Sequence, residues 1–172
     1  GRYHFTPGMS TNTAVNILRA GLQEPVQLVF NNIRTPEQLA GVVSRYLEAD
    51  SLSVLGLFTP AVAESYGFTM ETFPAMFITN TYEFYWTTSA EEFGDRMKRE
   101  NEAFWNAERQ EKARNLNMTP AEVATLAAIV QEESNKQSEK PRIAGVYINR
   151  LRKGMPLQAD PTVKFAAGDI TL

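Results

Sequence analysis

The chain has 172 residues, of which 43% are hydrophobic and 22% are charged, a composition typical of one or two folded domains with a real core. Its net charge of -3 offers no basic surface for nucleic acid, and the absence of cysteine excludes disulfides and thiolate metal sites. No apolar run approaches the roughly 20 residues of a membrane span and no signal peptide is visible, so any anchoring segment is expected upstream of this piece.

The first fifty residues alternate between the patterns of strands and helices. Residues 2–5 are predicted to form a short strand, and a capped apolar pattern predicts a helix over residues 11–21. Residues 26–30 are β-branched and aromatic, which favours a second strand, and residues 36–47 follow a cap and a proline and predict a second helix. The buried face of that helix is expected to consist of Leu39, Val42, Val43, Tyr46 and Leu47. The alternation predicts a small α+β lobe over residues 1–50.

The rest of the chain is predicted to be mainly helical with a few short strands. Short helices separated by turns are expected over residues 51–73, and the aromatic-rich residues 76–86 favour a strand. A capping box at Ser89 and Glu92 predicts a helix that continues to Asn115. Its many charges are expected to form a solvated face. We therefore divide the chain into a lobe of residues 1–50 and a region of residues 51–172.

One glutamate of the next predicted helix points to the apolar side of that helix. Thr119, Pro120 and Glu122 supply a cap, a first-turn proline and a capping-box acid. At about 100° per residue, Glu133 falls within the apolar stripe of this helix, whereas Glu132 falls on its polar back. Loss of hydration at such a position favours the protonated form of a carboxylate, which suits a general acid. A helix-end glutamate that merely hydrogen-bonds a neighbouring loop would have the same bearing.

The next helix is expected to start at Ser138, with Pro141 in its first turn, and to end at Gly154. Gly145 would allow close packing against the preceding helix. Its core face is expected to consist of Ile143, Val146, Tyr147 and Leu151. Cations gather in its last turn, namely Arg150, Arg152 and Lys153, where they complement the helix dipole or contact an anionic polymer.

An extended segment is expected to follow this helix. Alternation along it would place Gln158, Asp160 and Thr162 on one side. If that side faces Glu133, the three residues form a polar wall suited to sugar hydroxyls. If it does not, Asp160 and Pro161 simply start a turn.

Several motifs together resemble a known family. The stretches "LAAIVQEES" and "VYINRLRKGMPLQADPTV", with the spacing between them, closely resemble the MltG/YceG-like endolytic murein transglycosylases. The opening "GRYHFTPGMSTNTAVNILRAG" is similar to the LysM-like portion that precedes their catalytic region, and "MFITNTYEF" occupies the place of an aromatic segment. The resemblance spans nearly the whole chain. Family members continue past Leu172 into a segment that helps complete the cleft.

The chain departs from the family pattern at two positions. Gln131 stands where the family usually has the first acid of a Glu-x-Glu motif, so the resemblance assigns the catalytic role to Glu133. Thr79 stands where a proline is usual.

The resemblance implies a peptidoglycan lytic transglycosylase that needs no metal or organic cofactor. Glu133 would protonate the leaving oxygen between N-acetylmuramic acid and N-acetylglucosamine. It would then act as base on the muramyl 6-hydroxyl, which closes a 1,6-anhydro ring. The residues expected to contact sugar or to orient Glu133 are Ser134, Tyr82, Asn149, Gln158 and Asp160.

The resemblance also implies a place in the cell envelope. Members of the family are anchored in the inner membrane by a single N-terminal segment, with the domain in the periplasm. They work beside cell-wall synthases, the penicillin-binding proteins, as terminators of glycan polymerisation. Peptidoglycan strands are thus the expected partner, with no nucleic acid.

Three other functions are compatible with parts of this sequence, and each makes a different demand on it. A hydrolase would use Glu133 with Asp160 as a second carboxylate and would release reducing ends. A peptidoglycan-binding module without turnover would be indifferent to the loss of Glu133. An aminodeoxychorismate lyase, as the family is sometimes labelled, would need a lysine Schiff base and a phosphate cradle. The sequence has no glycine-rich phosphate loop, and its candidate lysines lie in polar contexts.

Overall fold

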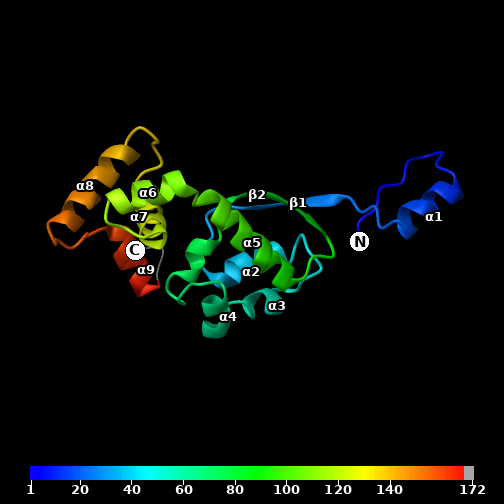
Figure 1. The fold of residues 1–172 in the computed structure, drawn as a ribbon, viewed down its shortest axis with the longest axis horizontal. Coiled ribbons are helices and arrows are strands. Elements are labelled where there is room, and N and C mark those ends of the chain that lie inside the picture. Colours follow the sequence, from blue (N-terminus) through cyan, green and yellow to red (C-terminus); the bar gives the residue numbers. More distant parts are fainter. Residues whose placement is uncertain (169–172) are drawn as a thin grey trace. The chain divides into compact units, whose positions relative to one another are not determined.

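The computed structural model describes residues 1–168 and divides into two compact units, Gly1–Ala103 and Phe104–Leu172 (Figure 1). The two units do not divide at residue 50. The reason is the sheet of the first unit, in which β1 (Pro25–Phe30) pairs with β2 (Asn80–Tyr85) and so joins segments on both sides of that residue. Helices combined with a small antiparallel sheet confirm the predicted α+β class.

The helices of the first unit begin at side-chain caps that the sequence supplies. Ser10, Thr35, Asp50 and Thr59 each accept a hydrogen bond from the backbone N–H three residues later, which satisfies a donor that the helix start leaves free. The helical elements are α1 (Thr11–Arg19), α2 (Pro36–Val43), α3 (Ser51–Leu55), α4 (Pro60–Ser65), the 3-10 helix η1 (Phe73–Met76) and α5 (Ala90–Phe104). The capping box predicted at Ser89 and Glu92 is present at the start of α5.

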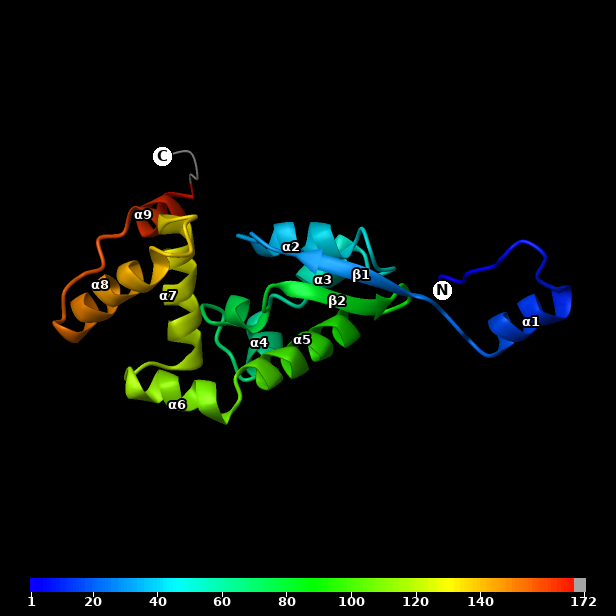
Figure 2. The ribbon, with the colours of Figure 1, turned by 90° about the horizontal axis from the view of Figure 1, so that it is seen from above.

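The two strands of the first unit bury one face and leave the other open (Figure 2). Pro25 lies opposite Tyr85 in the antiparallel register, and the inward-facing residues are Val26, Leu28, Phe30, Tyr82 and Phe84. They pack with α2 and α5 around Phe73, whose ring is fully buried and contacts Phe58 and Phe77 edge-on. Aromatic pairs of this kind stabilise a core beyond their buried area.

Two predictions about the first unit are wrong. Residues 2–5 form no strand, because their backbone has no strand to pair with; the Arg2 carbonyl accepts one hydrogen bond from the Glu24 N–H (2.8 Å). Tyr46 is 37% exposed rather than buried, and it lies in the turn that follows the end of α2 at Val43. Leu39, Val43 and Leu47 are buried as predicted.

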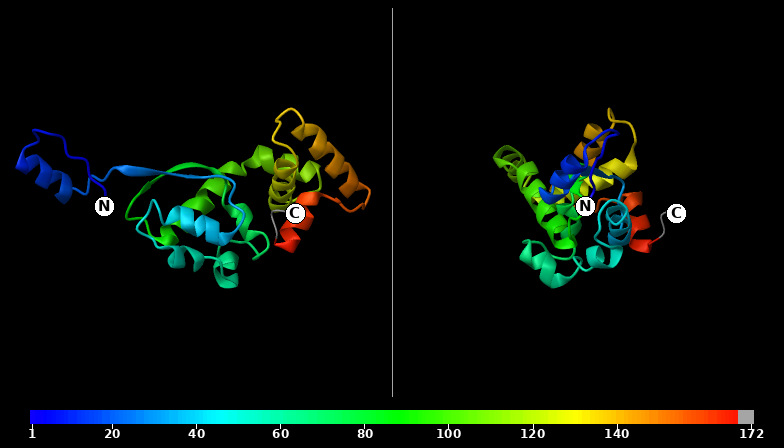
Figure 3. Two further views of the ribbon diagram at one scale, coloured as in Figure 1. Left: turned by 180° about the vertical axis from the view of Figure 1, so that it is seen from behind. Right: turned by 90° about the vertical axis from the view of Figure 1, so that its right-hand side faces the viewer.

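The second unit is helical throughout its described part, residues 104–168. It comprises α6 (Ala107–Asn115), α7 (Pro120–Glu133), α8 (Lys140–Arg152) and α9 (Asp160–Ala167). Helices α8 and α9 both pack against α7 (Figure 3), and a small core of Leu126, Val130, Tyr147 and Ala159 lies between them. Across residues 1–168, no helix has the length and apolar character that a membrane crossing requires.

The helix predicted to run to Asn115 is two helices. It ends at Phe104 because Asn106 begins a new one, adopting an extended backbone and accepting a hydrogen bond from the Arg109 N–H (3.0 Å). Asparagine favours this N-cap role over a position inside a helix.

Three predictions about α8 and the segment after it are also wrong, and a fourth is wrong in part. The N-cap of α8 is Glu139 rather than Ser138, and no side chain caps it. The extended segment ends at Ala159, because Asp160 and Pro161 occupy the first helical positions of α9. No described atom lies within 4 Å of a Cβ built on Gly145, so this glycine allows no close packing. Of the predicted core face of α8, Tyr147 is buried, but Val146 and Leu151 are 48% and 44% exposed.

Candidate active site

Glu133 lies at the C-terminal end of α7, where the apolar face of this helix ends. The capping box that the sequence predicted is present, with Thr119 and Glu122 bonding each other's backbone N–H. Glu133 is the last residue of α7 and lies one turn beyond the buried Val130. The expectation that Glu133 is dry is wrong, because the apolar cover ends with Val130 and the residue is exposed.

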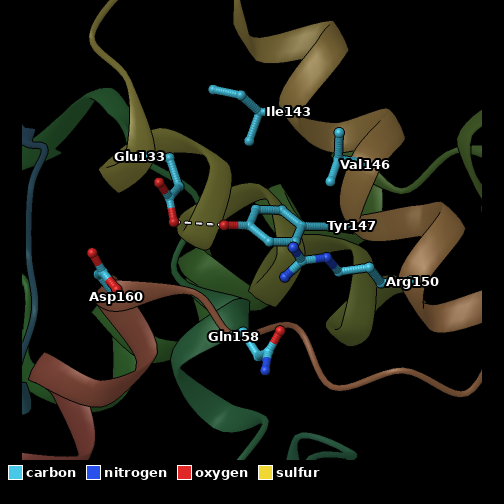
Figure 4. A pocket seen from close by; sticks show the side chains of 7 residues that line it. All are labelled: Glu133, Ile143, Val146, Tyr147, Arg150, Gln158 and Asp160. Atoms are coloured by element: carbon cyan, nitrogen blue, oxygen red, sulfur yellow. Dashed lines mark hydrogen bonds between the residues drawn. The ribbon is translucent and has the colours of Figure 1, made fainter.

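A tyrosine of α8 holds the Glu133 carboxylate. The Tyr147 hydroxyl donates a hydrogen bond to Oε1 of Glu133 (2.5 Å), while the Tyr147 ring is only 6% exposed (Figure 4). Burial, followed by the hydrogen bond to Glu133, raises the pKa of Tyr147 to about 12. The phenol therefore stays protonated near neutral pH, so that it remains a donor that fixes one carboxylate oxygen and leaves the other available.

Glu133 and Tyr147 line an open pocket of about 280 Å³. Its other lining residues are Ile143, Val146, Arg150, Gln158 and Asp160. In Figure 4, Glu133 and Asp160 lie on one side of the pocket, and the Arg150 guanidinium lies beside Gln158 on the other. The pocket thus combines acceptors and donors at its rim with the apolar ring of Tyr147.

The loop between α8 and α9 is tied to the pocket. Nη1 of Arg150 donates to the Leu157 carbonyl, and Ala159 is almost fully buried beneath the loop. Between them, Gln158 has a φ of 49°, in the left-handed region that residues with a Cβ seldom adopt. Backbone held in this way is common where a side chain must be presented at a site.

The structure brings two of the predicted contact residues to Glu133 and places three elsewhere. Gln158 and Asp160 line the pocket with Glu133, although they reach it from a loop and a helix start instead of an extended strand. Asn149 is exposed on α8 and does not line the pocket. The Ser134 hydroxyl donates to Oε2 of Glu139 (2.8 Å).

Tyr82 belongs to the first unit and lies in its core. It is 4% exposed, and its hydroxyl donates to the Ile78 carbonyl (2.6 Å). Burial is also the main cause that raises the pKa of Tyr82 to about 12.

Sequence reasoning missed the part that Tyr147 and Arg150 take in the site. Tyr147 was predicted as a core residue and Arg150 as part of a cationic helix end. The available indication was chemical: a tyrosine on a core face must find a partner for its hydroxyl. Residues three apart on a helix share a face, so Arg150 follows Tyr147 into the pocket.

The arrangement is suited to proton transfer on a ligand that enters the open pocket from solvent. An oriented carboxylate can exchange a proton with a leaving oxygen, and water leaves such a site when substrate fills it. Among residues 1–168, no group of three or more histidine, aspartate or glutamate side chains is placed to hold a metal ion.

Comparisons with known proteins agree with the motifs. The model of the YceG-like family matches residues 1–171. The chain is 33% identical over 96 residues to the endolytic murein transglycosylase of Bacillus subtilis, a match that covers 56% of this chain and 25% of that protein. It is 39% identical over 54 residues to the endolytic murein transglycosylase of Streptococcus pneumoniae, covering 31% of this chain and 10% of the relative. No solved structure matches the chain.

Proposed function

Because the chain belongs to the YceG-like family, whose model matches residues 1–171, we propose that it is an endolytic murein transglycosylase with Glu133 as its catalytic acid and base. The observation that carries this proposal is Glu133 in an open polar pocket, with its carboxylate held by Tyr147. The matched segments span a quarter or less of the relatives' lengths. The activity of a whole protein of this family is therefore part of the proposal.

The proposed reaction cuts the bond between N-acetylmuramic acid and N-acetylglucosamine within a strand. Protonated Glu133 gives its proton to the bridging oxygen as the bond to the anomeric carbon breaks. The muramyl 6-hydroxyl then attacks that carbon, and Glu133 takes the hydroxyl proton, which restores the acid. The products are a 1,6-anhydro end and a free 4-hydroxyl, with no water consumed. The nucleophile belongs to the substrate, so a single carboxylate is sufficient.

The remaining pocket residues are proposed to bind and orient the sugar. Gln158 offers an amide donor and acceptor, and Asp160 offers acceptors for hydroxyl groups. Arg150 retains unused N–H donors after its bond to the Leu157 carbonyl. Ser134 and Asn149 remain proposed contacts, which would require segments of the glycan strand outside the pocket. Tyr82 is not proposed as a contact, because it is buried in the core of the first unit.

The cellular role is proposed from the same family membership. Within the first unit, a LysM-like portion of residues 1–50 would hold peptidoglycan, and the region of residues 51–172 would carry out the cleavage. The protein would act in the cell envelope, held to the inner membrane by an N-terminal anchor and facing the periplasm. Beside penicillin-binding proteins, its cuts would terminate glycan polymerisation.

The decisive experiment is digestion of purified sacculi, with mass analysis of the strand ends. The ectodomain of the whole protein should release 1,6-anhydro ends, and Glu133→Gln should lower the rate by about 10²- to 10⁴-fold, because it removes the transferable proton. The matched control is Glu132→Gln, which removes the neighbouring carboxylate outside the pocket and should leave the rate unchanged.

Other outcomes point to the alternatives. Asp160 lines the same pocket as Glu133, which favours a hydrolase as the second candidate. Reducing ends in place of anhydro ends would establish that hydrolase. Full activity of Glu133→Gln would remove Glu133 from the reaction altogether.

A further inference from the structure

A second groove lies in the first unit, between the end of β2, the turn that follows it and α5. It encloses about 540 Å³, compared with about 280 Å³ for the Glu133 pocket. Strand β2 contributes Glu83 and Tyr85, and α5 contributes Arg96 and Arg99. The proposed reaction uses none of these side chains.

Two side chains of opposite charge line this groove without forming an ion pair with each other. Glu83 and Arg99 both line it, yet among residues 1–168 neither has a hydrogen-bond or ion-pair partner. The groove therefore presents a free set of acceptors on the strand side and a free set of donors on the helix side. A hydroxyl or an amide group can accept from a guanidinium and donate to a carboxylate, so a ligand rich in such groups satisfies both walls.

Other side chains that line the groove are held in place before any ligand arrives. Nε of Arg96 donates to Oε1 of Glu100 (2.6 Å), and its guanidinium lies 5.8 Å from the centre of the Phe84 ring. In the turn, the Thr88 hydroxyl donates to the Tyr85 carbonyl (2.7 Å). Binding to groups that are already ordered loses less entropy than binding to mobile ones.

An apolar surface completes the groove. The Tyr85 side chain lies on the open face of the sheet, where the residue is 54% exposed, and Pro25 is its partner across the two strands. The Tyr85 hydroxyl has no hydrogen-bond partner among residues 1–168, so it can bond a ligand. A flat ring beside scattered hydrogen-bonding groups matches a sugar, which has an apolar C–H face and a polar rim.

We propose that this groove is a second saccharide-binding site, which takes a segment of an N-acetylated amino-sugar strand. Tyr85 contacts the face of a sugar ring, and Arg99 and Glu83 hydrogen-bond its hydroxyl and acetamido groups. The choice of an amino sugar rests on the proposed function, whereas the groove itself requires only a polyhydroxylated ligand. A strand held at one site keeps its other segments at high effective concentration, which suits an enzyme that acts within a polymer.

Binding can be tested separately from turnover. The probe is the hexasaccharide of N-acetylglucosamine, added to the full chain carrying Glu133→Gln, with affinity from calorimetry and location from amide chemical shifts. Tyr85→Ala and Arg99→Ala should each weaken binding about fivefold to tenfold, the effect of losing one ring contact or one charged hydrogen bond. Shifts should appear at Thr87 and Thr88.

Matched controls keep the test specific. Tyr46→Ala removes another exposed tyrosine of the first unit, and Arg114→Ala removes an exposed arginine of α6; both lie outside the groove and should bind normally. Glu83→Gln preserves the shape of the side chain and guards against misfolding of the alanine variants. It should also weaken binding, because it removes one of the acceptors.

The outcomes separate this inference from the proposed function. Groove variants that bind as well as the controls overturn the second site, even if the whole protein releases anhydro ends. Groove variants that lose binding support it, even if no cleavage is found. Equal binding of a glucose hexasaccharide would overturn the assignment to an amino sugar.

Discussion

The two units stabilise themselves in different ways. The first has a core of sixteen buried residues, dense in aromatic rings, whereas the described part of the second, residues 104–168, has a cluster of four. The proposed catalytic acid lies in the second unit, where few apolar side chains shield it from solvent. Its carboxylate is therefore oriented by one hydrogen bond from Tyr147 rather than by burial. The contrast teaches that a site can be ordered by its hydrogen-bond partner where the apolar core is too small to enclose it.

The largest expected changes in stability come from substitutions that create a cavity in the core of each unit. Phe73→Ala should lower the free energy of unfolding of the first unit by about 3 to 5 kcal/mol, because a fully buried ring leaves a large void. Leu126→Ala should lower the free energy of unfolding of the second unit by about 2 kcal/mol, the low end of the range for leucine, because Leu126 belongs to a small cluster and is not fully buried.

Hydrogen exchange followed by mass spectrometry can assign each loss to its unit. Equal losses in both units would contradict the difference in packing. Val163→Ala is the control for the measurement, because this residue is 63% exposed and should change neither unit.

Much of the fold could be predicted, because several helices begin at short sequence motifs that are recognisable without tertiary contacts. The caps at Thr35 and Thr119 and the prolines after them act over three or four residues, so they can be read from the sequence. The exposure of Val146 and the absence of a strand at residues 2–5 could not be predicted. Both depend on which distant segment covers or pairs with them, and local patterns do not contain that information.

The face of the helix on which Glu133 lies could be predicted from the sequence, but the surroundings of its carboxylate could not. The helical bearing of Glu133 placed it on the side of Val130, and it does line a pocket there. Its exposure depends on where the apolar cover ends. The bond from Tyr147 depends on how two helices cross, which the spacing within one helix does not reveal.

A glycine-to-alanine change should have opposite signs in the two units. A Cβ on Gly94 of α5 would lie 2.8 Å from the Tyr66 hydroxyl, whose ring is stacked on Phe73 and resists displacement. Gly94→Ala should therefore destabilise the first unit by about 1 kcal/mol, after the gain in helix propensity offsets part of the strain. A Cβ on Gly145 meets no described atom within 4 Å, so Gly145→Ala should stabilise α8 by up to about 1 kcal/mol.

Urea unfolding of the two variants provides the measurement. The two substitutions share the same chemistry and both lie inside helices, so each is the control for the other. A loss of stability in Gly145→Ala would mean that α8 is covered on this side by something outside the described residues.

Removal of the Tyr147 hydroxyl should impair the proposed catalysis more than the fold. Tyr147→Phe keeps the buried ring but deletes the donor to Glu133. Because Glu133 is exposed, we expect this bond to be worth only about 1 kcal/mol, which corresponds to roughly a fivefold lower kcat. KM should stay unchanged, because the bond orients the acid instead of binding sugar. Tyr46→Phe is the matched control, and an unchanged kcat in Tyr147→Phe would show that Glu133 needs no orienting partner.

The two units should also differ in their response to alkaline pH. Burial raises the pKa of Tyr66 and Tyr82 in the first unit, and of Tyr147 in the second, to about 12 in each case. An unfolded tyrosine titrates near pH 10, so between about pH 10 and pH 12 the unfolded chain loses protons that the folded chain retains. The free energy of unfolding should therefore fall as the pH rises through this window, and it should fall further in the first unit because two of the three rings lie there. Tyr82→Phe should flatten the fall in the first unit and Tyr147→Phe that in the second; a fall that neither variant changes would have to come from other groups, such as the lysines.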